Sequence, residues 1–441
     1  MKLFRVLMTL LLSVVAVVCF APTAWAFCGF YVAKADTKLY NQASQVVIAR
    51  TGDRTLLTMA NDYQGEVKDF AIVVPVPVVL QKDQVHIGDP KVIERLDSFS
   101  APRLVEYFDP DPCAILQEDS ASGNGGSISL RSLAGISTVE AERALGVTVE
   151  ARFSVGEYDI FILSAKESDG LETWLKRNDY RIPDGANQLL RPYIRQNMKF
   201  FVAKVNLKEF DKAGYQRLRP LQMAYESPKF MLPIRLGMMN ATAAQDLVVY
   251  VLSPKGQAEI TNYRTVNVPS DAQIPVHVKG EFSDFYKAMF ETAYIREGKK
   301  VAFREYAWDM SNCDPCSAEP LNQEELKKAG VFWLTPNPNI SDNVFITRLH
   351  VRYTRDKFPE DLMFQETSNR QQFQGRYVLR HAFTGEMKCD AAREYKRALN
   401  QRFEEEAQTL AKLTGWKIQD IRKKTNITQG ENDPWWREVW P

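Results

Sequence analysis

The chain has 441 residues, with 56 Lys and Arg against 55 Asp and Glu. Hydrophobic residues make up 45% of it and charged residues 25%, which excludes a wholly disordered or collagen-like chain. The near balance of charge argues against a nucleic-acid-binding protein, because such proteins usually carry a basic excess. At about 100–200 residues per domain, the length predicts two or three domains.

Residues 1–26 have the pattern of a secretory signal peptide. Lys2 and Arg5 give a positively charged start, residues 7–20 are almost wholly apolar, and the segment ends in Ala-Trp-Ala, which a signal peptidase can read. The apolar run is shorter than the ~20 residues that a membrane-spanning helix needs. We therefore expect the mature protein to be soluble and exported, to the periplasm or outside the cell.

The first β-rich part of the mature chain is predicted over residues 27–166. Within it, residues 147–155 alternate between apolar and polar side chains, Gly156 can turn the chain, and residues 158–163 return as a more buried strand. Residues 117–127 form a polar, glycine-rich loop. A helical insert is predicted to follow over residues 167–198.

A second β-rich part is predicted over residues 199–385. It opens with a strand over residues 199–207, and residues 345–353 alternate with the clarity of a half-buried antiparallel strand. Beyond it, residues 386–441 are predicted to form a C-terminal helical segment and a Trp-rich tail. The predicted fold is therefore α+β, with two related antiparallel β-rich units, helical insertions and a long C-terminal helix.

The long helix is predicted over residues 391–414. Its apolar residues recur at helical spacing and form one stripe opposite a charged face. Asp390 is available as the N-cap and Gly415 as the residue that ends the helix. We expect this helix to lie on a surface and to pack through its stripe.

Two segments repeat the same order of short sequence blocks. Residues 56–77 and 234–254 each pass from an apolar stretch through a Met-containing block with Asn to aliphatic residues that end at proline. Each continues with a Val-His pair, a helical pattern over residues 91–107 or 282–296, and a loop that contains Asp-Pro-Cys. Ordinary strand and turn patterns can recur by themselves, but we favour an internal duplication.

The duplication hypothesis predicts a superposition. Residues 45–113 should follow the same order of strands and helices as residues 221–316. The histidines of the two Val-His pairs should then correspond, and Cys113 should lie near the position of Cys316.

Five cysteines remain after the signal peptide is removed. They are Cys28, Cys113, Cys313, Cys316 and Cys389. Exported proteins meet oxidising conditions, so disulfides are expected, and the odd number leaves at least one thiol free or paired between chains. We predict a Cys28–Cys113 bond, because the new N-terminus needs a tether. We also predict that Cys389 pairs with Cys313 or Cys316 and fastens the long helix to the β-rich body.

Cys313 and Cys316 form a CxxC motif, which can hold a redox-active disulfide. Asp314 places an anion between the two sulfur atoms, which disfavours a thiolate, and the flanking residues lack a strand–motif–helix pattern. We therefore favour a structural role. A structural zinc site would need two more ligands at short spacing. No metal and no cofactor are predicted.

Paired carboxyl groups suggest a glycosidase. Asp109 and Asp111 are the obvious pair, and Asp309 with Asp314 is the rough counterpart in the second unit. Such chemistry needs two acids that face a cleft about 5–10 Å apart. Asp-Pro sequences more often build turns, because Asp bonds its own backbone and proline fixes φ.

Four histidines are sorted by the strand face on which they fall. His86, His277 and His350 each lie opposite the apolar residues of their segment, which predicts positions facing solvent or an interface. His381 shares its face with apolar neighbours, which predicts a hydrogen-bonded core histidine. No nucleophile signature accompanies any of the four.

The chain ends in a segment rich in tryptophan, with Trp435, Trp436 and Trp440. Such a tail can anchor at a membrane interface or in a groove of a partner. The alternative, which we favour slightly, is that the tail folds back over an apolar gap on its own body.

Several blocks together resemble an uncharacterised bacterial family, the domain of unknown function 2330. The blocks are FCGFYVA at Phe27, LTMANDY at Leu57, VVPVP at Val73, YFDPDPC at Tyr107 and CDPC at Cys313. The resemblance reaches to about His381. It implies an exported bacterial protein and brings no established activity, so no catalytic residue is carried over from it.

The sequence favours an exported, non-enzymatic binding or envelope-associated protein, with an unknown protein or envelope component as its partner. The alternative is an exported enzyme, either a hydrolase that uses acidic residues or a thiol oxidoreductase that uses Cys313 and Cys316. A cleft lined by acids with raised pKa values would favour the hydrolase, and an exposed cysteine pair beside a positive surface would favour the oxidoreductase. Closed packing around both would favour a binding protein. Ligand and oligomeric state are left open.

Overall fold

A computed structural model describes the greater part of the chain. The described residues are 30–33, 40–41, 44–60, 63–64, 70–113, 147–178, 186–212, 218–239, 244–312, 314, 318–335 and 343–425. The predicted signal peptide, Cys28, Cys313, Cys316 and the Trp-rich tail lie outside these residues. The described part mixes helices with mostly antiparallel sheets and a long C-terminal helix, so the predicted fold class is confirmed.

A nine-stranded sheet forms the centre of the fold. Its order is β16 (Arg264–Asn267), β18 (Val301–Asp309), β19 (Phe345–Tyr353), β14 (Gln245–Ser253), β3 (Ser44–Thr51), β4 (Arg54–Ala60), β12 (Leu221–Glu226) and β7 (Val85–Ile87), with β21 (Phe373–Gln374) paired to β18. β14 and β3 pair in parallel at the centre. Strands from both predicted β-rich parts therefore share one sheet, and the boundaries between those parts stay a prediction.

A five-stranded antiparallel sheet packs against one face of the central sheet. Its order is β1 (Phe30–Ala33), β6 (Phe70–Val76), β11 (Lys199–Val205), β10 (Tyr158–Ala165) and β9 (Val147–Val155). Alternate aliphatic and aromatic residues of both sheets interlock in the main core, for example Ile48, Val249, Tyr158 and Phe201. The predicted hairpin is confirmed, and Gly156 supplies the positive φ of 54° that its turn needs.

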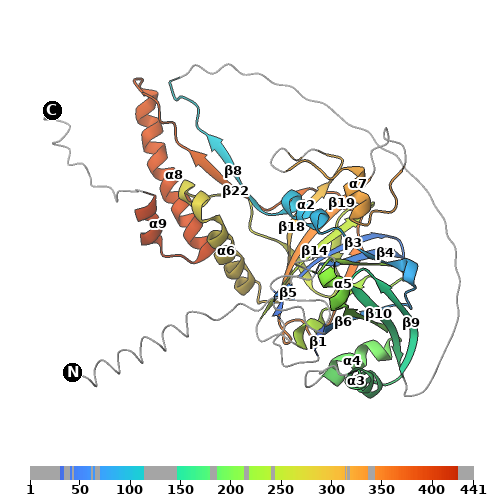
Figure 1. The fold of residues 1–441 in the computed structure, drawn as a ribbon. Coiled ribbons are helices and arrows are strands. Elements are labelled where there is room, and N and C mark those ends of the chain that lie inside the picture. The colour runs from blue at the N-terminus through green and yellow to red at the C-terminus, as the bar shows by residue number, and fades with distance from the viewer. Residues whose placement is uncertain are drawn as a thin grey trace, which may run out of the picture.

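Two helices cover the outer face of the five-stranded sheet. They are α3 (Ser168–Arg177) and α4 (Ala186–Arg195), at the bottom of Figure 1, and both fall within the helical insert predicted from the sequence. Their apolar sides pack on the outward residues of β6, β10 and β11. The predicted strand over residues 199–207 ends early, because Leu207 begins the short helix α5 (Leu207–Lys212).

The second face of the nine-stranded sheet is covered by α2 (Pro90–Ser100), α7 (Gln323–Lys328) and α6 (Phe282–Arg296). The helix predicted over residues 282–296 is confirmed. The helix predicted over residues 91–107 is wrong in its second half, since α2 stops at Ser100 and the chain continues as β8 (Arg103–Phe108). Pro102 explains the stop, because proline disfavours a helical conformation in the residue before it.

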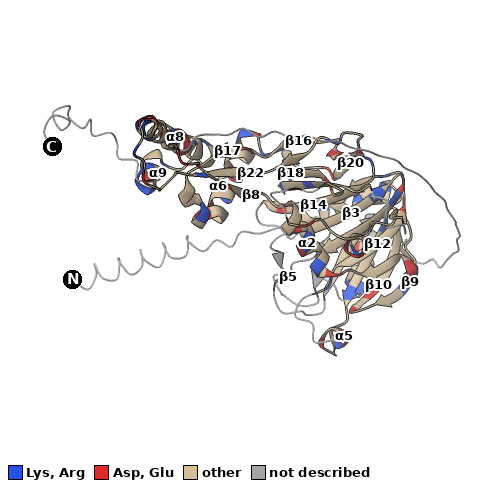
Figure 2. Ribbon diagram, turned by 90° about the horizontal axis from the view of Figure 1, so that it is seen from above, with Lys and Arg blue, Asp and Glu red and all other residues tan. Residues whose placement is uncertain are grey.

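The C-terminal helices and a small parallel sheet form a lobe at one end of the molecule (Figure 1). The sheet has the order β17 (Ala272–Gln273), β22 (Arg376–His381) and β8. α6, α8 (Ala391–Thr414) and α9 (Ile418–Lys424) pack together with it in one hydrophobic cluster. Figure 2 also places this lobe at the end of the molecule away from β9 and β10.

α8 has the bounds that the sequence predicted. Gly415 ends it with a positive φ of 73°, and its N–H bonds to the carbonyl of Ala411. Asp390 occupies the N-cap position, but its backbone is helical and its side chain makes no capping hydrogen bond. The prediction of Asp390 as a side-chain cap is therefore wrong.

The remaining short elements connect these layers. They are β2 (Tyr40–Asn41) and β5 (Tyr63–Gln64), which pair; β13 (Met231–Leu232), β20 (Leu362–Glu366) and β15 (Ala258–Ile260), which form a three-stranded sheet; and the 3-10 helices η1 (Lys82–Gln84), η2 (Arg235–Met239) and η3 (Val276–Glu281). None of the helices that the structure describes is long and apolar enough to cross a membrane.

The predicted superposition of residues 45–113 on 221–316 is wrong, because the elements differ in order and in sheet. The aliphatic runs of the two segments become β6 in the five-stranded sheet and β14 in the nine-stranded sheet. His86 lies in the strand β7, whereas His277 lies in η3. Cys316 is outside the described residues. The likeness is local: in each segment a helix and then a strand follow the Val-His pair.

Candidate functional site

A group of charged side chains crosses the face of the nine-stranded sheet that carries α2 and α6. We call it the charged seam and define it as Asp246 of β14, Glu305 of β18, and Arg348, His350 and Arg352 of β19. The seam lies between the hydrophobic cluster under α2 and α7 and the cluster under α6. Since alternate residues of a strand share a face, the pattern of β19 places its three cations together.

Glu305 lies on the helix-covered face together with Val301 and Phe303, and β18 has an irregularity directly after it. The register with β19 passes from Arg304 directly to Tyr306, so Glu305 is the extra residue of a β-bulge. The bulge changes the alternation, so that Tyr306 lies on the same helix-covered face as Glu305. There Glu305 is 1% exposed and accepts hydrogen bonds from Arg348 Nε at 2.6 Å, from His350 Nδ1 at 2.7 Å and from the hydroxyl of Tyr286.

The ionisation of Glu305 is fixed by its partners. Burial alone would raise the pKa of this carboxyl, but the charges of His350 and Arg348 and the hydrogen bonds from His350 and Tyr286 lower its pKa to about 2. In return, burial and the neighbouring carboxylate raise the pKa of the Tyr286 hydroxyl well above its usual value. Glu305 is therefore a permanent anion at neutral pH.

His350 lies between two carboxylates. Its Nδ1 donates to Glu305 and its Nε2 to Asp246 at 3.0 Å, and the ring stacks on Phe290 with centroids 4.0 Å apart. Burial would lower the pKa of His350, but the charge of Glu305 and the bonds to both acids raise it to about 9. The prediction that His350 faces solvent or an interface is wrong, because only 12% of its side chain is exposed and α6 covers it.

The ends of the seam hold the two covering helices. Arg348 Nη1 donates to Asp97 of α2 at 2.7 Å. Arg352 binds both carboxylate oxygens of Asp246 at 2.8 Å and also reaches Glu291 of α6 at 2.7 Å. General acid–base catalysis works best with a group that titrates near the operating pH. Glu305 and His350 titrate far from neutrality on either side, so the seam is suited to holding helices in place.

A second charged cluster fastens α8 to the small parallel sheet. We call it the Asp109 cluster, and it contains Asp109 after β8, Arg380 of β22, and Tyr395 and Arg402 of α8. Asp109 has a side chain that is 3% exposed. It accepts from Arg380 Nε at 2.7 Å, from Arg402 Nη1 at 2.8 Å and from the Tyr395 hydroxyl. Burial would raise the pKa of Asp109, but these three donors lower it overall.

Glu406 extends the Asp109 cluster by one turn of α8. Its side chain is 2% exposed, and its Oε1 lies 3.5 Å from Arg402 Nε without a hydrogen bond to it. Burial raises the pKa of Glu406 to about 7, although the charge of Arg402 opposes this shift. The sequence analysis missed Glu406. Helical spacing could have identified it, because Glu406 lies one turn after Arg402 on the side of α8 that carries the apolar stripe.

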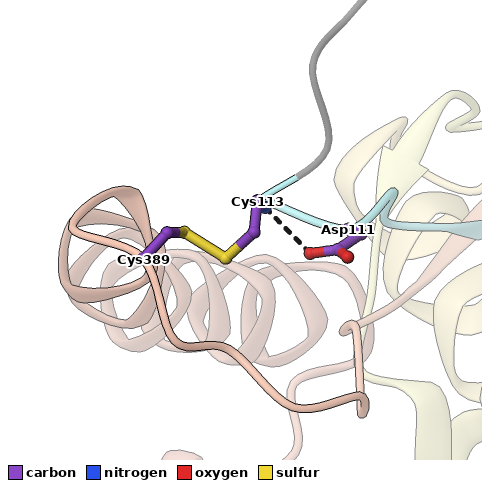
Figure 3. Close-up of a disulfide and its surroundings, with 3 residues drawn as sticks. All are labelled: Asp111, Cys113 and Cys389. Carbon is purple, nitrogen blue, oxygen red and sulfur yellow. Dashed lines mark hydrogen bonds between the residues drawn. A yellow bond between two sulfur atoms is a disulfide. The ribbon is translucent and has the colours of Figure 1, made fainter.

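The acids that form possible catalytic pairs in the sequence make other contacts. Asp111 accepts from the backbone N–H of Cys113 at 2.8 Å, so it builds a turn (Figure 3). Asp309 accepts from Arg370 and from Ser311, while Asp314 accepts from Tyr306 at 2.9 Å and Gln374 at 2.6 Å.

A disulfide joins Cys113, just after β8, to Cys389, just before α8 (Figure 3). Their Cα atoms are 5.8 Å apart and the residues are 276 positions apart in the chain. The predicted bond between Cys28 and Cys113 is therefore wrong. The predicted bond of Cys389 to Cys313 or Cys316 is also wrong, because β8 runs alongside β22 and brings Cys113 to the start of α8. The expected staple of α8 to the body exists, but with another partner.

The remaining histidines occupy three different environments. His86 is exposed, as predicted, and bonds to the carbonyl of Asp83. His277 is half-buried with both ring nitrogens unbonded, and burial lowers its pKa. His381 was predicted to lie in the core, but its side chain is 24% exposed, bonds to Glu106 at 2.8 Å and stacks on Phe108. His381 is the last residue of β22 and lies at the edge of the helical lobe, which explains why its side chain is partly exposed.

The predicted site residues are not among those that line the pocket beside β15 and β16. This pocket is shallow, with a volume of about 410 Å³, and Glu259, Arg264 and Arg304 contribute charged groups to it. The predicted acids and histidines are all elsewhere. Within the described residues, no group of three or more His, Cys, Asp or Glu side chains could hold a metal ion.

The fold and its clusters define an α+β protein of two packed sheets with a disulfide-linked helical lobe. The chain belongs to the family described as "Uncharacterized protein conserved in bacteria (DUF2330)", whose model matches residues 22–365. The resemblance drawn from the sequence blocks is thus confirmed, and the match ends before α8. No curated protein and no solved structure matches the chain significantly.

The disulfide should contribute strongly to stability. Replacing Cys389 with Ser should lower the free energy of unfolding under oxidising conditions by about 5 kcal/mol in the chain-entropy model, less any strain. Cys113→Ser should cost the same, and the double variant no more, because both remove one bond. Denaturant unfolding with and without reductant measures this. An equal loss of unfolding free energy in reductant would contradict the prediction, because the disulfide is then broken in the unsubstituted protein as well.

The charged seam should make stability depend on pH. The pKa of His350 is raised from 6.5 to about 9, so its protonated ring stabilises the fold fully below its unfolded pKa and loses this effect as pH rises through about 9. The free energy lost in His350→Gln should therefore be largest near pH 6 and shrink by on the order of 2 kcal/mol near pH 9.5.

Urea unfolding at both pH values measures this difference, and His86→Gln is the matched control for removing an exposed imidazole. A loss in His350→Gln that stays constant across the range would contradict the assigned ion pairs.

Proposed function

We propose that the protein is exported and acts by binding in the cell envelope rather than by catalysis. The observation that carries this proposal is that the central charged side chains of the charged seam and of the Asp109 cluster are enclosed and paired. Glu305 and Asp109 are buried, and His350 is only 12% exposed. Partners that hold helices to sheets neutralise all three. A catalytic group must reach its substrate, and each of these groups is turned toward its own ion-pair and hydrogen-bond partners.

The cysteine chemistry supports export. The Cys113–Cys389 bond is a long-range connection between two elements, which is the usual role of disulfides in oxidising compartments. The apolar run of residues 7–20 and the small residues up to Ala26 support the same destination. Together they favour a protein that works outside the cytoplasm, where a disulfide can form and persist.

The strongest point in favour of a hydrolase is Glu406, whose pKa is raised to about 7 while the pKa of its neighbour Asp109 is lowered. Groups with separated pKa values are typical of acid–base pairs. However, both side chains are at most 3% exposed, and three donors occupy Asp109. We therefore favour a structural role for this pair and a binding role for the protein.

Expression of the full chain in a bacterium tests the proposal. The purified protein should begin at Phe27, should be released from the envelope fraction, and should contain a peptide linked through Cys113 and Cys389. Leu12→Arg, which interrupts the apolar run, is the matched control and should stay unprocessed in the cytoplasm.

Cross-linking of intact cells before fractionation should then join the wild-type protein to an envelope component and leave the Leu12→Arg protein unjoined. Uncut protein with free Cys113 and Cys389 thiols in the cytoplasm would refute export. Processed protein that forms no envelope cross-link would refute the binding role while leaving export intact.

A further inference from the structure

The pocket of about 410 Å³ opens where the nine-stranded sheet meets the three-stranded sheet. Its walls come from β15, from β16, from the loop that joins these two strands, and from Arg304 of β18. β16 is the edge strand of the larger sheet and β15 is an edge strand of the smaller one. Figure 2 shows β16, β18 and β20 close together at this side of the molecule. A pocket of this volume can hold a small molecule.

Hydrogen bonds fix the loop that joins β15 to β16. Asn262 donates to the carbonyl of Asp361 at 2.8 Å and accepts from the N–H of Met363 at 3.0 Å. The hydroxyl of Tyr263 accepts from the N–H of Glu360 at 2.9 Å. This wall of the pocket is therefore preformed, and its polar groups are already used within the protein. The charged side chains of the pocket are left to meet a ligand.

Arg304 presents part of its guanidinium group without an anionic partner. Its Nε donates to Asn267 at 2.8 Å and its Nη1 donates to Gln257, and both acceptors are neutral amides. Within the described residues, Nη2 has no acceptor and no carboxylate is within ion-pair distance of the group. Burial lowers the pKa of Arg304, although the charge of Glu259 opposes this shift. A partly buried cation with neutral partners attracts an anion.

Glu259 of β15 supplies the opposite charge in the same pocket. Its carboxylate makes no hydrogen bond and no ion pair with any residue that the structure describes. Its charge acts on the pKa of Arg304, so the two groups are near each other although they are not in contact. A cation and an anion thus line one pocket with a space between them.

Arg264 of β16, the third charged residue of the lining, is already neutralised. Its Nη2 donates to Glu297 at the end of α6 at 2.9 Å, and 68% of its side chain is exposed. The groups that remain for a ligand are therefore Arg304 and Glu259. A ligand that carries only a negative charge would meet the carboxylate, and one that carries only a positive charge would meet the guanidinium group. A ligand with both charges pairs with both groups.

We propose that this pocket binds a small zwitterion of the α-amino-acid type, with its carboxylate on Arg304 Nη2 and its ammonium group on Glu259. Two charge-assisted hydrogen bonds of about 2.8 Å and the roughly 3 Å between the charged groups of an α-amino acid together reach up to about 9 Å. Such a molecule can therefore bridge two side chains that do not touch. The inference does not depend on export or on an envelope partner, since it concerns a pocket of the protein itself.

Isothermal titration calorimetry of the purified, disulfide-bonded protein tests the site. The standard L-amino acids are added singly, and at least one should bind with a dissociation constant below about 1 mM. Acetate and methylammonium carry the two charges separately. Each should bind at least about tenfold more weakly than that amino acid, because each leaves one charge of the pocket unpaired. Failure of every amino acid to bind, or equally tight binding of acetate, would overturn the proposal.

Glu259→Gln is the decisive variant, because Glu259 has no partner among the described residues and its replacement should leave the fold intact. It should weaken binding of the amino acid at least about tenfold without weakening binding of acetate. Arg304→Gln should weaken binding of both. Arg54→Gln is the matched control, since it removes an arginine of the same sheet that pairs with Glu226 outside the pocket, and it should change the affinity less than about twofold.

Unchanged amino-acid affinity in Glu259→Gln would overturn the proposal, whatever Arg304→Gln does to the fold. That result would leave the export and cross-linking experiments unaffected, because neither of them involves this pocket.

Discussion

The need to neutralise one buried cation, Arg348, and two partly buried ones, His350 and Arg352, shapes the central sheet. β19 places Arg348, His350 and Arg352 on a face that helices cover, and an unpaired charge there would cost several kcal/mol. β18 supplies Glu305 beside its bulge, and β14 supplies Asp246. The same ion pairs reach α2 and α6. Charge pairing thus accounts for the attachment of two helices to the sheet.

The helical lobe is attached by a different combination of forces. A covalent bond joins Cys113 to Cys389 at the start of α8, and the Asp109 cluster joins the same helix one to three turns later. An apolar stripe then packs α8 on α6. Because the family match ends at residue 365, these contacts link the matched part of the chain to a segment beyond it. Reduction of one disulfide would weaken the attachment while leaving the ion pairs and the stripe.

Local sequence patterns predicted local structure correctly, whereas the predicted contacts between distant segments were wrong. The stripe and Gly415 were enough to place α8, and alternation placed β9, β10 and β19. Alternation also grouped His350 with its neighbouring arginines, but it cannot tell whether a helix covers that face. The Cys113–Cys389 bond depends on the pairing of β8 with β22, which no local pattern reports. The odd spacing of the apolar residues Phe303 and Tyr306 was visible in the sequence and is the signal of the bulge beside Glu305.

The central claim is that the charged seam is a structural network whose members depend on one another. A double-mutant cycle with Glu305→Gln and Arg348→Gln, read out as the free energy of unfolding in denaturant, tests it most directly. The two side chains are in contact at 2.6 Å, and both are buried. The account predicts a coupling energy of about 1–3 kcal/mol, with each single variant strongly destabilised. Additive effects of the two substitutions, with a coupling energy near zero, would contradict it.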